Sequence, residues 1–174
     1  PHNIEAEQAL LGAILVNNEA FYRVSDFLEP VHFYEPIHRD IYELAGKIIR
    51  AGKSADPTTI KTHLPEQLLP DVTMAQYLAR LAAEATTVLN AADYGQAIYD
   101  LAIRRNLILV GEEMVQVAYE SDVEMTPDKQ IEKVEGELFQ LAEKGRYDGG
   151  FLNFGTALSA SIQMAGEAFQ RDGG

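Results

Sequence analysis

Apolar positions between residues 94 and 144 recur at steps of three and four, the spacing of one face of an α-helix. They form two series, separated by the mostly polar segment 121–127. Thr126 suits a helix N-cap and Pro127 suits the first helical position. We expect two helices joined by so short a connection to fold back as an antiparallel hairpin. The first series contains Ile103, Leu107, Val110, Met114 and Val117, and the second contains Ile131, Val134, Leu138 and Leu141.

The same spacing predicts several shorter helices before the hairpin. Asn3, Asp56 and Thr73 stand where N-caps are expected, and Gly52 stands where a helix should end. Segment 65–70, bounded by two prolines, is predicted as a turn, and no alternation typical of a strand competes elsewhere. The fold class is therefore all-α. The expected helices cover about residues 4–15, 20–28, 36–51, 57–64 and 74–81.

This pattern predicts three parts in chain order. Residues 1–92 form a globular multi-helix head, residues 93–144 form the long antiparallel helical hairpin, and residues 145–174 form a flexible linker. The linker carries one amphipathic helix, with Leu158, Ile162 and Phe169 on its apolar side. A single helix tethered between flexible segments is expected to dock outside its own domain.

Composition narrows the functional classes. The 174 residues include 14 Lys and Arg and 27 Asp and Glu, which give a net charge of −13. Because proteins bind the phosphate backbone mainly through Lys and Arg, we expect little direct binding of nucleic acid by this chain. There is no cysteine, which excludes disulfides and thiolate metal sites. No apolar run approaches the roughly 20 residues that cross a bilayer, so we expect no membrane association.

Two motifs suggest chemistry, and each has a simpler interpretation. Gly52, Lys53 and Ser54 resemble the end of a phosphate-binding P-loop, but the glycine required at position 47 is Lys47. They fit the end of a helix better. Glu35 and His38 match the Glu-x-x-His pair of di-iron bundles, but Glu35 stands at the start of a predicted helix, where the helix dipole already favours a carboxylate. We predict no catalytic, cofactor-binding or metal-binding residue in this chain.

Blocks of the sequence spread along the whole chain carry a family resemblance. The opening, residues 1–15, is the most specific block, and later positions follow in the family's order. The chain resembles the N-terminal region of bacterial replicative DNA helicases of the DnaB type. The later matching positions are Phe33, Tyr34, His38, Ile41, Asp56, Thr59, Ile60, Leu64, Tyr77, Leu78, Leu81, Tyr94, Ile98, Ala102, Arg105, Ile108, Ile131, Leu138, Ala142 and Glu143.

The resemblance implies an assembly and a function. In that family the region is a collar of six copies, built as a trimer of dimers, and its last helix packs on the ATPase domain of a neighbouring subunit. A RecA-like ATPase domain, with ATP and Mg²⁺, is expected after residue 174. The parent helicase would unwind the fork 5′ to 3′ in the bacterial cytoplasm, at the nucleoid. The collar would recruit the C-terminal domain of a DnaG-type primase, and a helicase loader is a further candidate partner.

The apolar periodicity and the family resemblance together indicate candidate site residues. Except for Val117, the apolar positions of the two series, eight residues in total, are expected to form the packing and self-assembly surface of the hairpin. Leu158, Ile162 and Phe169 are expected to dock the linker helix. Two alternatives stay open: a free-standing helical adaptor without a motor domain, and a metal-dependent helical enzyme. The polar candidates for primase contact are Arg105, Glu112, Glu113, Gln116 and Lys133.

Overall fold

The structure is a computed structural model that describes residues 1–85, 88–144 and 166. The chain divides into two compact units, Pro1–Arg105 and a second unit that begins at Asn106. Helix α6 (Ala91–Tyr119) contributes to both units. The predicted linker-helix residues Leu158, Ile162 and Phe169 lie outside the described residues.

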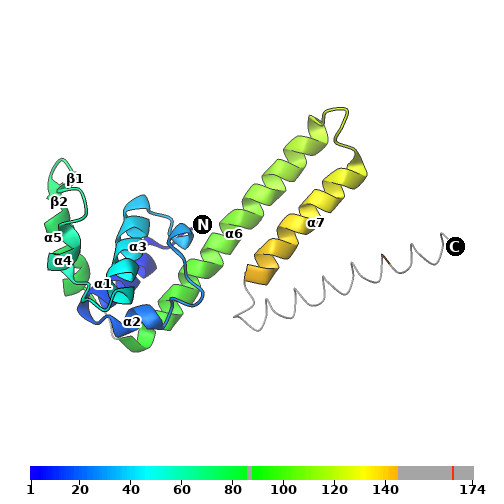
Figure 1. Ribbon diagram of the computed structural model, residues 1–174. Helices are drawn as coiled ribbons and strands as arrows, with labels where there is room; N and C mark the ends of the chain where they lie inside the picture. Colours follow the sequence, from blue (N-terminus) through cyan, green and yellow to red (C-terminus); the bar gives the residue numbers. More distant parts are fainter. Residues whose placement is uncertain (86–87, 145–165, 167–174) are drawn as a thin grey trace. The chain divides into compact units, whose positions relative to one another are not determined.

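The first unit is a bundle of short helices, and the predicted all-α class is confirmed (Figure 1). The second unit contains the rest of α6 and helix α7 (Pro127–Lys144). Before α6, the helices in chain order are α1 (Ile4–Val16), α2 (Glu19–Tyr22), the 3₁₀ turn η1 (Pro30–His32), α3 (Pro36–Arg50), α4 (Pro57–Lys61), α5 (Met74–Ala83) and the 3₁₀ turn η2 (Val88–Asn90).

Helix α1 is the centre of the first unit because it packs against α2, α3 and α5. Gly12 allows the closest approach, since a Cβ atom at that position would overlap the carbonyl oxygen of Leu81 in α5. Gly95 of α6 similarly admits the side chain of Val24. The fully buried apolar side chains include Leu10, Leu11, Ile14, Phe21, Phe33, Ile41, Ile60, Leu78 and Ile98.

The helix boundaries follow the predicted caps. The Asn3 side chain accepts a hydrogen bond from the Ala6 amide (3.0 Å), and Asp56 and Thr73 form capping boxes at the starts of α4 and α5. Gly52 has a φ of 76°, which is in the left-handed region. Its amide donates to the Ile49 carbonyl (2.9 Å), and the next amide, that of Lys53, donates to the Ile48 carbonyl (3.1 Å). This geometry is that of a helix C-terminus, not of a P-loop.

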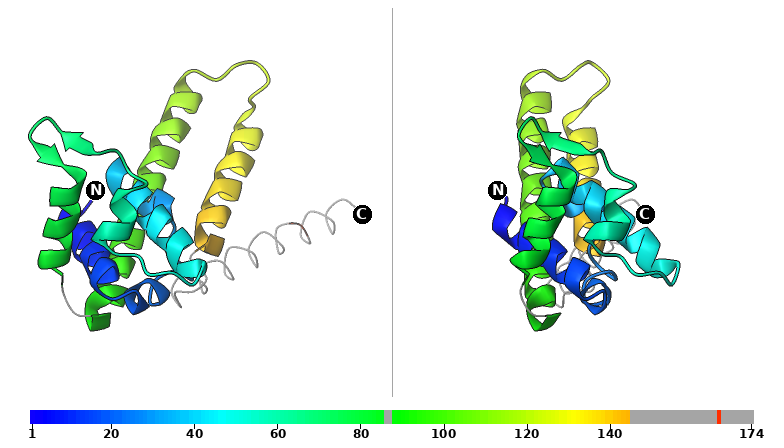
Figure 2. Two further views of the ribbon diagram at one scale, coloured as in Figure 1. Left: turned by 60° about the vertical axis from the view of Figure 1, so that its left-hand side comes forward. Right: turned by 90° about the vertical axis from the view of Figure 1, so that its left-hand side faces the viewer.

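Three predictions about local structure were wrong in detail. The helix expected over residues 57–64 ends at Lys61. The helix expected over residues 20–28 ends at Tyr22, and the chain continues in turns, because Val24 bonds back to Phe21 three residues earlier. Segment 65–70 is part of a small antiparallel hairpin, in which β1 (Gln67–Leu69) pairs with β2 (Val72–Thr73). Figure 2 shows this hairpin at the start of α5. The strands are too short for an alternating pattern to reveal them.

A buried polar chain joins three helices of the first unit. Glu7 of α1 and His38 of α3 are 2% and 1% exposed, and the Glu7 carboxylate lies 2.8 Å from Nδ1 of His38. The same carboxylate accepts the backbone amides of Tyr34 (2.8 Å) and Glu35 (3.3 Å). Because a carboxylate only accepts hydrogen bonds, Nδ1 carries the hydrogen.

The other ring nitrogen of His38 faces Tyr77 of α5. Its Nε2 atom lies 2.5 Å from the Tyr77 hydroxyl, which also accepts the side-chain amide of Gln8 at 3.4 Å. Burial raises the pKa of Tyr77, which favours the protonated hydroxyl as the donor to Nε2. Both nitrogens of His38 are therefore engaged within the protein, which argues against the metal site considered for Glu35 and His38.

The close packing at Gly12 gives a first prediction. We expect Gly12→Ala to destabilise the chain by about 1–3 kcal/mol, because α1 and α5 must separate to admit the methyl group. The control is Gly136→Ala in α7, where a Cβ atom meets nothing within 4 Å and helix propensity should increase stability. Urea unfolding followed by circular dichroism measures both. Equal stability of Gly12→Ala and the natural chain would contradict the packing.

The polar chain gives a second prediction. Tyr77→Phe removes the donor to Nε2 of His38, so a buried nitrogen loses its partner, and we expect a loss of about 1–3 kcal/mol. Tyr22→Phe is the control, since that side chain is exposed and should change stability little. Thermal unfolding compares the two variants. A Tyr77→Phe chain as stable as Tyr22→Phe would show that the hydroxyl is not needed.

Candidate assembly and docking surface

The second unit is a helical hairpin whose two arms lie side by side (Figure 1). A loop after Tyr119 leads into α7, where Thr126 accepts the Lys129 amide at 3.3 Å and Pro127 takes the first helical position. The predicted start of this helix is therefore confirmed.

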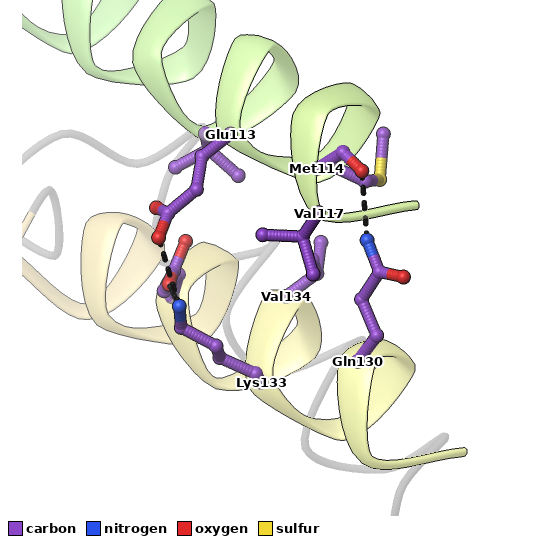
Figure 3. Close-up of a pocket in the computed structure, with 8 residues that line it drawn as sticks. Glu113, Met114, Val117, Gln130, Lys133 and Val134 are labelled. Atoms are coloured by element: carbon purple, nitrogen blue, oxygen red, sulfur yellow. Dashed lines mark hydrogen bonds and ion pairs between the residues drawn. The ribbon is translucent and has the colours of Figure 1, made fainter. Parts of the chain in front are cut away.

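The arms meet around a hollow with an apolar floor. Val117 and Val134 approach each other from opposite arms, with Met114 beside them (Figure 3). The hollow is lined by Val110, Glu113, Met114, Val117, Gln130, Lys133, Val134 and Glu137. Three of the eight predicted seam residues, Val110, Met114 and Val134, are thus brought together within one chain.

Polar side chains bridge the arms on either side of these valines (Figure 3). Gln130 donates its side-chain amide to the Met114 carbonyl (2.7 Å), and the Lys133 amine lies 2.8 Å from the Glu113 carboxylate. The hydrogen bond and the charge of Glu113 raise the pKa of Lys133. Lys133 also lies 3.9 Å from Glu137. These contacts fix the register of the two arms.

The other predicted seam residues lie in different surroundings. Ile103 is buried in the first unit, whereas Leu107 and Ile131 are exposed on the hairpin. Leu138 and Leu141 are half-buried. The single periodic series therefore divides into side chains that close the hairpin and side chains that remain open to solvent. Assembly by the open ones stays a prediction.

Sequence reasoning missed a second apolar face on α6. Ile108, Val115 and Tyr119 are 46%, 54% and 86% exposed. They are spaced by seven and four residues, so they share one side of the helix, roughly opposite Val110, Met114 and Val117. Their spacing was visible in the sequence, but the stronger series through Leu107 and Met114 obscured it.

The polar candidates for primase contact fall into three groups. Glu112 and Gln116 are exposed on α6, and Glu113 and Lys133 pair with each other. Arg105 belongs to the first unit. Primase contact by any of them stays a prediction.

Arg105 binds backbone groups within the first unit. Its guanidinium donates to the carbonyls of Pro1 (2.8 Å) and His32 (2.9 Å) and lies 5.5 Å from the centre of the Tyr34 ring. The Tyr34 ring also stacks on His2 at 4.0 Å. Burial lowers the pKa of Arg105. This side chain therefore connects the start of the chain and η1 to α6.

Across residues 1–85 and 88–144, no three His, Asp or Glu side chains are grouped so that they could hold a metal ion. Within the same part of the chain, no helix is long and apolar enough to span a membrane.

Comparisons with known proteins agree with this geometry. The family described as the DnaB-like helicase N terminal domain matches residues 1–100. The replicative DNA helicase DnaB of Rickettsia conorii is 44% identical over 173 residues, which cover 99% of this chain and 35% of that protein. The chain thus spans about a third of the length of this relative.

Two solved structures are similar in fold. The crystal structure of the N-terminal domain of DnaB helicase from Mycobacterium tuberculosis aligns with a TM-score of 0.71 and 28% identity, covering 80% of this chain and 98% of that one. A DnaB-like replicative helicase, described together with its interactions with primase, aligns with a TM-score of 0.61 and 26% identity, covering 80% and 31%. With the match over residues 1–100, these likenesses show that the chain belongs to the family of DnaB-like helicase N-terminal domains.

Proposed function

We propose that this chain is the oligomerisation and primase-docking domain of a hexameric replicative DNA helicase. The observation that carries the proposal is the large amount of apolar surface on the hairpin. Leu107, Ile108, Val115, Tyr119 and Ile131 are all exposed although they are apolar. Exposed apolar patches of this kind are typical of surfaces that bind other proteins.

The parent protein supplies the chemistry in this proposal. The chain itself is non-catalytic, and an ATPase domain that uses ATP and Mg²⁺ would drive 5′ to 3′ unwinding at the replication fork in the bacterial cytoplasm. Support comes from the helicases of about three times this length to which the chain is similar. That similarity extends over 99% of the chain, which favours a helicase domain over a free-standing adaptor.

The proposed partners are further copies of the chain, the primase C-terminal domain and, through residues 145–174, the ATPase domain of a neighbouring subunit. A helicase loader is a further candidate. The primase proposal is supported by the similar helicase whose structure was described with its interactions with primase. A helical hairpin with exposed apolar faces suits such a role, because helical partners bind through apolar positions spaced by three and four residues.

Self-assembly gives a third prediction. We expect the double variant Leu107→Gln, Ile131→Gln to lower the mass of the chain measured by light scattering, because both side chains are apolar and exposed on the hairpin. Val123→Gln is the control, since Val123 is fully exposed in the connecting loop. Thermal unfolding should be nearly unchanged in both. An unaltered mass of the double variant would place the assembly contact elsewhere.

Primase docking gives a fourth prediction. We expect saturable heat release when the C-terminal domain of the cognate primase is titrated into the assembled chain. The same preparation, checked by light scattering, should hydrolyse no ATP. An assembled oligomer that binds no primase would refute the docking role and leave the assembly role intact. Measurable ATP hydrolysis would refute the non-catalytic assignment.

A further inference from the structure

The second apolar face of α6, defined by Ile108, Val115 and Tyr119, has no role in closing the hairpin. The side chains that line the hollow on α6 lie on the other side of the helix. Glu112 stands within this second face, four residues after Ile108 and three before Val115, and it is exposed. The face is therefore an apolar stripe that contains a carboxylate.

The charge of the hairpin decides which partner fits this stripe. Between residues 106 and 144 the chain has ten acidic side chains and only three lysines. Lys133 is paired with Glu113 and Glu137, and the Lys129 amine donates to the Glu124 carbonyl at 3.2 Å. Two of the three lysines are thus used inside the hairpin. Among the described residues, Glu113 and Glu137 are the carboxylates of the hairpin that have a lysine amine within 4 Å.

These charges disfavour a second copy of the same face. Two identical stripes would bring the carboxylates of both hairpins together, and like charges across an interface oppose binding. A cationic partner would instead be attracted by the negative potential of these carboxylates. The apolar spacing of seven and four residues matches the contact positions of an amphipathic helix.

We propose that the Ile108, Val115 and Tyr119 face of α6 docks a basic amphipathic helix of another protein. The partner's apolar side packs on the three side chains, and its Lys or Arg residues surround Glu112 and the neighbouring carboxylates. The proposal deepens the docking role proposed above, because it assigns that role to one face and gives the chemistry of the partner. Docking and self-assembly then use different residues, because Leu107 and Ile131 are the positions proposed for self-assembly.

The test uses two synthetic helical peptides with the same leucine stripe, one with lysines and the other with glutamines on its polar side. We expect the lysine peptide to bind the full chain and to shift the amide resonances of residues 108–119. The glutamine peptide should bind at least about tenfold more weakly. Raising NaCl from about 50 to 300 mM should lower the affinity for the lysine peptide about fivefold, because salt screens the attraction between its lysines and the carboxylates of the hairpin.

Variants of the chain test the face itself. The double variant Val115→Gln, Tyr119→Gln should lower the affinity for the lysine peptide about tenfold. Glu112→Gln alone should reduce the dependence of this affinity on salt. Val123→Gln is the control, since it removes an exposed apolar side chain from the connecting loop, outside this face and outside the proposed assembly positions. All four positions are exposed, so circular dichroism should show unchanged folding.

Several results would overturn the proposal. These are absence of binding, equal binding of both peptides, binding unaffected by the Val115 and Tyr119 double variant, or shifts confined to other residues. A dimer that dissociates only in that double variant would assign the face to a second copy instead. The primase titration is independent, so a face that binds the lysine peptide would stand even if the primase domain did not bind.

Discussion

The buried carboxylate of Glu7 is the interaction on which the first unit depends. It lies in α1 and receives hydrogen bonds from the 34–35 segment and from His38 of α3, which in turn contacts Tyr77 of α5. A buried charge without such partners would cost several kcal/mol. Satisfying it requires α1, α3 and α5 to be present together, so the polar chain specifies one arrangement where apolar packing alone would tolerate others.

The second unit is held together by a different kind of contact. Its arms close on a small apolar contact between Val117 and Val134, with polar bridges at Gln130 and Lys133. A hairpin of this kind has little interior, and many of its apolar side chains therefore remain at the surface. This is the physical reason why the hairpin, more than the well-packed first unit, suits contact with other proteins.

Helix α6 serves both units, and its residues change role along its length. Ile98, Tyr99 and Ile103 are buried in the first unit, and Arg105 ends this part by binding the carbonyls of Pro1 and His32. Beyond Asn106 the same helix presents one apolar side to α7 and another to solvent. The Gly95 contact and the Arg105 hydrogen bonds tie the buried part in place.

Local signals in the sequence determined much of this protein by themselves. The caps at Asn3, Asp56, Thr73 and Thr126, and the helix end at Gly52, were predictable because each depends on residues only a few positions apart. Helical periodicity likewise gave the all-α class and the two arms. The strands β1 and β2 were missed because they are only three and two residues long.

Tertiary structure decided everything that depends on residues far apart in the chain. Glu7, His38 and Tyr77 look like unrelated polar residues in the sequence, and only the packing of three helices brings them together. The series from Ile103 to Leu141 was correctly seen as apolar, but periodicity cannot tell a buried position from an exposed one. That distinction depends on which neighbour covers each side of α6: the first unit covers Ile103, α7 covers Val117, and solvent reaches Val115 and Tyr119.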